Sequence, residues 1–568
     1  MRYEFLPPRF SELPNNRPTS SAPVIQHPDS PDTPAYKVQV LLPAPSPLSP
    51  PASALTTKTN TPAASQVATP RSEPIPAERV LTPADVTTLF LRSLLQSAEA
   101  FLGKSVDGAV LTAPGWFAHA QLGALQEAAE AAGIRVLQIL EDAGAAALCA
   151  AASATMTTTQ STVVGPDRTQ LVVDLGASSL ALSLLAVRQG LFHHLAPPAY
   201  HADELGGDAI DDRLLKFFAK DFTKKTSVPL KVAPANETPD LRAEARLRLA
   251  LLHTKRTVAA SVSGAGGSAA TCAVESLKDG LDYTGSINRL RFDMEAAPIY
   301  RGVVARVGEL LQRAGLDWVH VDEVVYAGGS ACLPGLDAAL AAHLREDAST
   351  PFVTGTVAGG GMGDPTTVLA RGAALQARLL ADINGADERV RKAFERGSEL
   401  VGVQTTARTI GVLFPEAAKE GAEGLGGQWI GGIQAETAVP VRRTYALEVD
   451  LGEQAEVGEK RVGLEVWEVK EGIKLEKVKP PKEDSEDEGY EDEEEEEEEM
   501  EVREKTIEKE AYLGALVVPT KLAWKQGERW RTSIVVQFLI GPDGKLEVLA
   551  YERGKGSTKQ GEVSSLVL

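Results

Sequence analysis

Apolar residues recur at helical and strand spacings through the middle of the chain. Residues 83–103 open with a proline and then place apolar side chains three and four positions apart, which predicts an amphipathic helix. The following segments predict a strand at 109–114, a helix at 118–132, a strand at 136–140 and an alanine-rich helix at 144–152. Strands that alternate with helices in this way are typical of a parallel or mixed sheet with helices packed on it.

A second sheet segment follows a break in this pattern. A buried strand at 171–174 precedes an alternating strand at 180–188, and a Gln-Gly turn joins the latter to another strand at 191–195. Further helices are predicted at 208–224, 239–257, 293–314, 334–346 and 367–381, and further strands near 270–275 and 323–327. We therefore expect residues 78–381 to form one α/β body.

The pattern changes again after residue 381. Residues 382–407 are polar and lack a strand pattern, so we expect them to act as a linker. Between 408 and 568 short alternating segments dominate, at 409–413, 444–450, 463–468, 533–540 and 545–551. Hairpin turns such as Gly541-Pro-Asp-Gly544 join several of them. This part of the chain predicts a small β-domain.

Proline and charge are unevenly distributed along the 568 residues. Of 35 prolines, 17 lie in residues 1–76, so we expect residues 1–77 to be a disordered arm. Residues 483–501 contain 15 acidic residues and no basic one, and they supply most of the net charge of −20. The consecutive like charges at 491–499 repel one another, which favours a solvated, disordered insert over a specific contact.

The remaining composition excludes several classes of protein. A protein that grips the phosphate backbone needs a basic face, whereas 58 Lys and Arg stand against 78 Asp and Glu, so nucleic acid is not expected as a direct partner. No window reaches the ~18–20 consecutive apolar residues of a membrane span, and Pro7 and Pro8 interrupt the place of a signal-peptide core. Cys149, Cys272 and Cys332 form no CxxC pair, which argues against a disulfide framework or a cysteine zinc site. We expect a soluble, cytoplasmic protein.

Three glycine-containing turns carry the candidate chemistry. They are DLGASS at 174–179, LGGD at 205–208 and AGGS at 327–330. Glycine lets backbone N–H groups converge on an anion, and the last two turns run into predicted helices whose N-termini favour negative charge. One such turn alone is weak evidence, because α/β folds also need glycine for packing. The candidate phosphate-binding residues are Asp174, Gly176, Ser178, Ser179, Gly206, Gly207, Asp208, Gly328, Gly329 and Ser330.

Longer segments surround these turns and continue the pattern. They include AVLTAPGWF at 109–117, LVVDLGASS at 171–179, LGGDAIDDRLLKFF at 205–218, LLHTKRTVAAS at 251–261 and DEVVYAGGSACLPGL at 322–336. In order and spacing they resemble the seventy-kilodalton heat-shock protein family. The resemblance implies an actin-like (ribonuclease H-like) nucleotide-binding body followed by a β-sandwich-like substrate-binding domain. It implies ATP as the cofactor, with Mg²⁺ only through bound nucleotide, and it assigns Lys255 and Arg256 to the adenosine side.

The sequence departs from that family at positions that matter for catalysis. We expect no counterpart before residue 78 of the family's first phosphate loop, or of the lobe that carries its catalytic lysine. Asp142 stands where the family has a longer glutamate, as a weakened remnant of the catalytic groups, and Ala202 stands where an aspartate is expected. Because phosphoryl transfer depends on positioned charges, these changes predict little or no ATP hydrolysis. No catalytic residue is assigned, and ATP binding stays open.

Within the family, the chain resembles an atypical ribosome-associated branch of fungi. The supporting segments are ARGAALQARLLADI at 370–383, YTGSINRLRF at 283–292 and the acidic run that leads into EVREK at 501–505. We expect neither a helical lid nor the family's leucine-rich linker. The resemblance implies a co-chaperone that works with a J-domain protein, reaches the ribosome indirectly and assists unfolded or nascent polypeptides.

Other interpretations stay open for the chain and for single residues. An ordinary ATP-dependent folding chaperone would bind and hydrolyse ATP, and a decayed or incomplete gene product would have no stable fold. Lys255 and Arg256 are equally well explained by salt bridges on a helix. His193, His194 and His253 have no further ligand at metal-binding spacing, so packing or exposure is the simpler explanation for them.

Overall fold

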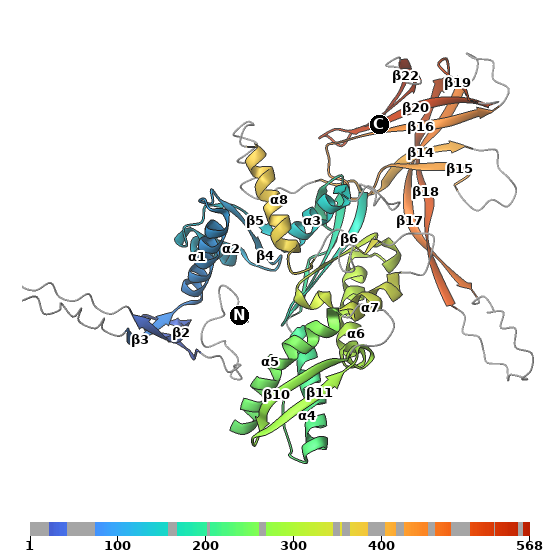
Figure 1. The fold of residues 1–568 in the computed structure, drawn as a ribbon. Coiled ribbons are helices and arrows are strands. Elements are labelled where there is room, and N and C mark those ends of the chain that lie inside the picture. Colours follow the sequence, from blue (N-terminus) through green and yellow to red (C-terminus); the bar gives the residue numbers. More distant parts are fainter. Residues whose placement is uncertain are drawn as a thin grey trace, which may run out of the picture. The chain divides into compact units, whose positions relative to one another are not determined.

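The computed structural model describes the chain in segments. These are residues 22–42, 74–156, 167–201, 205–260, 269–344, 353–354, 364–383, 404–415, 425–452, 461–478, 500–526, 529–554 and 560–568. The chain divides into two compact units, whose elements are drawn in Figure 1. The first unit comprises Met1–Ala113, Phe117–Ile139 and Leu380–Glu395. The second, called the large unit below, comprises Pro114–Trp116, Leu140–Leu379 and Arg396–Leu568.

The first unit combines two small sheets with two helices. Its elements are β1 (Val24–His27), β2 (Ser30–Leu42), β3 (Ile75–Leu81), α1 (Pro83–Leu102), β4 (Ala109–Ala113), α2 (His119–Ala131) and β5 (Val136–Glu141), whose last two residues belong to the large unit. Helix α1 begins where predicted, because Thr82 and Asp85 form a capping box around Pro83. Its core consists of Leu91, Ala113, Leu125, Ala129, Ala132 and Ile134.

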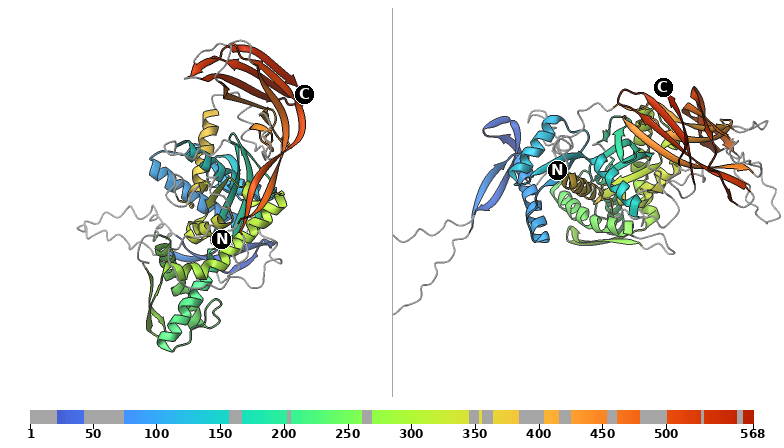
Figure 2. Two further views of the ribbon diagram at one scale, coloured as in Figure 1. Left: turned by 90° about the vertical axis from the view of Figure 1, so that its right-hand side faces the viewer. Right: turned by 90° about the horizontal axis from the view of Figure 1, so that it is seen from above.

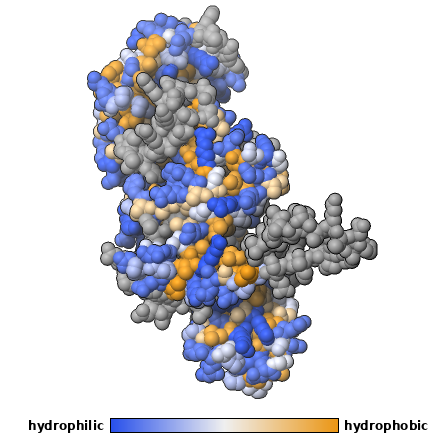
Figure 3. Space-filling view, turned by 90° about the vertical axis from the view of Figure 1, so that its left-hand side faces the viewer, coloured by the Kyte–Doolittle hydropathy of each residue, from blue (hydrophilic) through white to orange (hydrophobic). Residues whose placement is uncertain are grey.

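Helix α1 also leaves large apolar side chains on the surface. Phe90, Leu94 and Phe101 are 58%, 49% and 91% exposed. Figure 3 shows a face of the molecule on which hydrophobic residues interrupt the hydrophilic surface. The described residues leave about half or more of each of these three side chains exposed.

The predicted disordered arm over residues 1–77 is wrong for part of its length. β1 and β2 lie within it, and they form a three-stranded antiparallel sheet with β3 in the order β1-β2-β3. Residues 36–40 alternate apolar and polar side chains. The segment pairs with β3 from Tyr36 opposite Leu81 to Leu42 opposite Ile75. This short alternating segment forms a strand because β3 supplies a pairing partner. Residues 1–21 and 43–73 lie outside the described part of the chain.

The body of the large unit is built on a six-stranded mixed sheet. Its strands are β6 (Asp167–Leu175), β7 (Leu180–Arg188), β8 (Leu191–His194), β9 (Ala199–His201), β12 (Glu323–Ala327) and β13 (Val353–Thr354). They run in the order β13-β12-β6-β7-β8, and β9 also pairs with β7. β12 is parallel to β6, whereas β6 and β7 form an antiparallel hairpin. The sheet is mixed, as the sequence pattern predicted.

Helices lie against this sheet, and a second hairpin packs on α4 and α5 away from it (Figures 1 and 2). They are α3 (Asp142–Met156), α4 (Gly207–Thr226), α5 (Thr238–Ala260), α6 (Arg289–Ala314), η3 (Trp318–His320), η4 (Gly329–Cys332), α7 (Pro334–Leu344), α8 (Val368–Ile383), β10 (Ala270–Lys278) and β11 (Leu281–Ile287). Alternate residues of the central strands enter different cores: Leu171, Val173 and Leu184 pack with α4 and α6, whereas Val172 and Leu185 pack with α3. Both faces of the sheet are therefore buried, which explains its nearly continuous apolar strands.

Two further sheets form the β-domain of the large unit. The first has the order β15-β14-β17-β18 and the second the order β16-β20-β21-β22, with β19 on β20. Their strands are β14 (Thr409–Pro415), β15 (Gly427–Ile433), β16 (Val441–Gly452), β17 (Arg461–Val478), β18 (Met500–Pro519), β19 (Trp524–Gln526), β20 (Arg529–Ile540), β21 (Leu546–Arg553) and β22 (Gln560–Val567). Both sheets contribute to one core, for example through Val466 and Val536, so the domain is a β-sandwich.

Some predicted segments cannot be compared with the structure. Most of the predicted linker at 382–407 and nearly all of the acidic insert at 483–501 lie outside the described residues. The strands on either side of the insert, β17 and β18, pair with each other from Arg461 opposite Pro519 to Val478 opposite Met500. The insert thus joins the two strands of one long hairpin.

A buried ion pair between β6 and β12 generates the first prediction. Arg168 Nε lies 2.6 Å from Glu323 Oε2, both side chains are less than a tenth exposed, and Gln170 also donates to that carboxylate at 2.7 Å. Glu323→Ala leaves the guanidinium buried without its partner, so it should lower the free energy of unfolding by about 3–5 kcal/mol. Urea unfolding followed by circular dichroism measures this loss.

The exposed pair Arg306–Glu309 provides the control for that measurement. Glu309→Ala should cost less than about 1 kcal/mol, because water screens an exposed pair. Equal losses for the two variants would contradict a structural role for the Arg168–Glu323 pair.

Candidate functional site

The turn after β6 lies against the start of α4. The amide of Gly207 donates to the Gly176 carbonyl at 3.0 Å. The next amide of the helix, that of Asp208, donates to the Ala177 carbonyl at 2.7 Å. A β-carbon on Gly206 would collide with this same carbonyl, so glycine permits the close approach. The structure therefore brings the first two predicted turns together and joins them by hydrogen bonds.

The third glycine turn meets the other two at the same edge of the sheet. β12 runs parallel to β6 with Ala327 opposite Asp174, so both strands end at that edge. Gly328 has a φ of 88°, and a β-carbon there would lie 2.5 Å from Asp174 Oδ1. The hydroxyl of Ser330 would collide with a β-carbon on Gly207. Residues from three distant parts of the sequence thus converge at one edge of the sheet.

Lys255 of α5 reaches this point, whereas Arg256 does not. Lys255 Nζ would lie 3.6 Å from a β-carbon on Gly207, and it pairs with Asp211 Oδ1 of α4 at 2.8 Å. Burial raises the pKa of Asp211, and the ammonium group of Lys255 opposes that shift. Arg256 lies exposed on the same helix. Asp211 could not be identified from the sequence as the partner of Lys255, because 44 residues separate the two.

Asp174 is a half-buried acid at the end of β6. Burial raises its pKa to about 6. Asp174 and Asp142, the first residue of α3, line one cavity of about 20 Å³ together with Glu141 and Trp116. A cavity of this size holds about one water molecule. The predicted catalytic remnant Asp142 is therefore next to the phosphate-side aspartate.

The other predicted residues have simpler positions. Ser178 and Ser179 are half-buried in the turn between β6 and β7, and Gly329 begins η4. Ala202 lies outside the described residues. Within the described segments no three His, Cys, Asp or Glu side chains are grouped so that they could hold a metal ion. Those segments also contain no helix that is long and apolar enough to span a membrane.

Two histidines that had no evident partner in the sequence are paired in the structure. His193 Nε2 lies 2.9 Å from Glu436 Oε2, and His194 Nε2 lies 2.8 Å from Glu141 Oε2. The two glutamates are 243 and 53 residues away along the chain. Sequence spacing contained no signal for contacts that only the tertiary fold creates.

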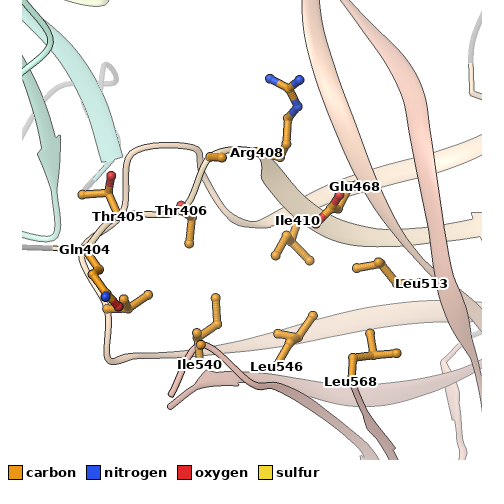
Figure 4. A pocket seen from close by; sticks show the side chains of 13 residues that line it. Gln404, Thr405, Thr406, Arg408, Ile410, Glu468, Leu513, Ile540, Leu546 and Leu568 are labelled. Carbon is orange, nitrogen blue, oxygen red and sulfur yellow. The ribbon is translucent and has the colours of Figure 1, made fainter. Parts of the chain in front are cut away.

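The β-domain contains a larger cavity of about 650 Å³, shown in Figure 4. Apolar side chains from both sheets, including Ile410, Ile540 and Leu546, line it together with Arg408 and Glu468. Such a lining suits an apolar group with polar atoms at its edge.

Comparison with known proteins identifies the family of these features. The Hsp70 protein family matches residues 63–391. The chain belongs to the Hsp70 family. A heat shock protein 70 homologue of Schizosaccharomyces pombe is 30% identical over 494 residues, which cover 86% of this chain and 77% of the relative. The ribosome-associated complex subunit SSZ1 of Saccharomyces cerevisiae is 30% identical over 487 residues, which cover 86% and 80%.

Another relative matches a shorter part of the chain. A ribosome-associated molecular chaperone of Eremothecium gossypii is 30% identical over 307 residues, which cover 54% of this chain and 45% of the relative. These matches confirm the predicted family, and with it the actin-like body followed by a β-sandwich. The family match begins at residue 63, earlier than the boundary expected at 78.

The residues at the converged turns fit the phosphate end of ATP with Mg²⁺, the usual ligand of the Hsp70 family. The glycine turns and Ser330 would hold the phosphates, and the half-buried Asp174 carboxylate would face the cation. When bound, the cation would neutralise phosphate charge. The amides of Gly207 and Asp208 already donate hydrogen bonds to backbone carbonyl groups. Other groups of the turns would therefore bind an anion.

The raised pKa of Asp174 gives a pH-dependent prediction. A carboxyl group whose pKa is higher in the folded state binds its proton more tightly there, so stability falls as pH rises from about 4 to 6. Asp174→Asn removes the half-buried charge, and it should raise the free energy of unfolding by roughly 1–3 kcal/mol at pH 7.5. At pH 4.5 the gain should fall to roughly a third of that value, because the folded carboxyl group is then still protonated. Urea unfolding of the large unit at both pH values measures it.

The exposed Asp450 provides the matched control. Asp450→Asn should give no gain in stability at either pH, because its exposed carboxylate is already stabilised by the Gly452 N–H and by Arg529. A gain for Asp174→Asn that is the same at pH 4.5 and pH 7.5 would contradict a half-buried, ionisable Asp174.

Proposed function

We propose that this chain is a co-chaperone of ribosome-associated protein folding in the cytoplasm, that it works with a J-domain partner and that it hydrolyses little or no ATP. Its relatives include the ribosome-associated complex subunit SSZ1, which matches across both the body and the β-domain. The observation that carries the proposal is a phosphate-side site whose glycine turns converge, while the carboxylates that line a cavity with Asp174 are Glu141, which pairs with His194, and the short Asp142. The chain therefore combines a nucleotide fold with weakened catalytic groups.

Slow hydrolysis follows from which charges are available at this site. Phosphoryl transfer needs cations on the phosphates and a group that orients the attacking water. Lys255 is engaged with Asp211 at 2.8 Å, and Asp142 is one methylene shorter than a glutamate. Removing one charge-stabilising group typically costs a factor of about 10²–10³ in rate. The expected result is binding of partner and client without an ATP-driven cycle.

Steady-state ATP turnover tests the catalytic part of this proposal. The purified full chain should release phosphate no faster than the Gly206→Leu variant, in which the side chain collides with the Ala177 carbonyl. Both rates then measure contamination. Turnover of the unmodified chain well above that of the variant would overturn the proposal.

Co-purification from native cells tests the partner. The tagged chain should retain a J-domain protein and ribosomes, and deletion of residues 483–501 should leave that binding unchanged, because a run of like charges is expected to be solvated. Loss of the J-domain protein on deletion would show that the acidic insert is a contact surface. Absence of the J-domain protein from every preparation would reject the partnership.

An ATP-dependent folding chaperone is the second candidate. The convergence of three glycine turns at Asp174 favours it, because that arrangement suits phosphate groups. Isothermal titration with ATP and Mg²⁺ separates the two candidates when it is combined with the turnover assay. ATP binding with turnover favours the folding chaperone. Absence of turnover favours the co-chaperone, whether or not ATP binds.

A further inference from the structure

The outer face of α1 carries a row of apolar side chains that the core of the first unit does not use. Phe90, Leu94 and Phe101 are 58%, 49% and 91% exposed, and the small Ser97 is exposed between them. At about 100° per residue these four side chains fall within about 60° of one another around the helix axis. We call them the α1 stripe. Soluble monomers rarely expose several large apolar side chains side by side, so the stripe is a candidate docking surface.

α1 is attached to its own unit through a different side of the helix. Leu91 is buried in the core of that unit. Thr88 Oγ1 and Arg92 Nη2 donate to the Ala128 and Ala131 carbonyls of α2 at 3.2 and 2.8 Å. α1 and α2 therefore lie side by side (Figure 1). These contacts hold the helix in place and leave the α1 stripe on the surface.

The side chains beside the stripe suit the close approach of a second helix. Between residues 89 and 102 the charged side chains are those of Arg92 and Glu99. Arg92 donates to α2, and Glu99 accepts a backbone N–H of the loop after α1 at 3.1 Å, so both are directed to their own unit. Next to the stripe lie Ser93, Ala98 and Ala100, which are small and exposed. Small side chains at a contact let two helix axes come close together.

The spacing of the α1 stripe is self-complementary. Its members recur at steps of four, three and four residues, which is the a and d spacing of paired helices. In an antiparallel pair centred on the middle of the stripe, Phe90 of each copy lies opposite Phe101 of the other. Leu94 then lies opposite Ser97, whose hydroxyl already donates to the Ser93 carbonyl at 2.9 Å. A parallel pair would instead put Ser97 opposite Ser97 and leave a void.

A second copy is better suited to cover the stripe than the nearby segments of the same chain. Residues 1–21 and 43–73 are rich in proline, which interrupts helices. α1 of a second copy is a helix that is already formed, with its N-terminus capped by Thr82 and Asp85. A preformed helix loses less conformational freedom when it binds.

We propose that α1 pairs in antiparallel orientation with α1 of a second copy, and that the α1 stripe is the contact. From Phe90 to Phe101 the contact is about 17 Å long. A single pair of helices of this length buries less than the about 1,200 Å² of a standard interface, so the dimer should form reversibly and at high protein concentration. This inference goes beyond the proposed function, because the pairing needs neither a J-domain partner nor ATP.

Sedimentation equilibrium of the full chain over a series of concentrations tests the pairing. The unmodified chain should show a reversible monomer–dimer equilibrium. Leu94→Glu places a charge from each copy in the contact, so it should raise the dissociation constant more than about tenfold. Leu89→Glu is the matched control: Leu89 is 50% exposed on the same helix but lies about 110° from the middle of the stripe. This variant should associate like the unmodified chain.

Ser97→Leu tests the same contact by a gain, which a variant that fails to fold cannot produce. The new side chain would pack against Leu94 of the other copy, so the dissociation constant should fall by about tenfold. The proposal would be overturned if the unmodified chain and Ser97→Leu both stayed monomeric at every concentration. Equal weakening by Leu94→Glu and Leu89→Glu would overturn it too, because the contact would then lie outside the stripe.

Cysteine cross-linking tests the orientation of the pair. Under mild oxidation, Phe90→Cys and Phe101→Cys chains should form a disulfide-linked dimer when they are mixed and not when each is alone. The unmodified chain, in which Cys149 and Cys272 are buried, is the blank. Cross-linking of each variant by itself, with none between the two, would show a parallel pair and contradict the antiparallel arrangement.

Discussion

The antiparallel ladder between β6 and β7 is the constraint on which the rest of the large unit depends. It runs without a break from Asp167 opposite Arg188 to Leu175 opposite Leu180. Its apolar side chains alternate between two cores, so the hairpin fixes the helices on both faces of the sheet. One end of the ladder positions the glycine turns, and the other end carries Asp167 and Arg188, which contact Arg443 and the Ala435 carbonyl of the β-domain.

The glycine turns and the contacts between the body and the β-domain therefore lie at opposite ends of one hairpin. The glycine turns converge through backbone contacts, as at Gly206 and Gly328, and these contacts depend on close packing more than on a ligand. At the other end, Arg188 and Arg443 contact the Ala435 carbonyl and Asp167 between the body and the β-domain. The chain has the Hsp70 architecture of an actin-like body followed by a β-sandwich.

Much of the fold could be predicted from periodicity. The helices α1, α4 and α6 and the strand β7 lie close to their predicted positions, because each has an apolar face of clear period. β1 and β2 were missed because prolines surround them and their pairing partner β3 is distant in sequence. Strand β18 was missed because its charged residues alternate with few apolar ones, and its register comes from β17.

The site could be predicted in part for a similar reason. Glycine turns are short motifs that can be recognised locally, and the structure brings all three together. The partners of Lys255, His193 and Arg443 could not be predicted, because each lies more than 40 residues away along the chain. Ion pairs of this kind have no sequence period, since they depend on how whole elements pack.

The most direct measurement of the central claim is hydrogen exchange of the full chain under native conditions, with and without ATP and Mg²⁺. The structure predicts that any change in protection stays near the glycine turns at 174–179, 205–208 and 327–330, and that β14 to β22 exchange at unchanged rates. A change in protection across the β-domain on adding ATP would contradict the claim, because it would show that the two ends of the β6–β7 hairpin are coupled.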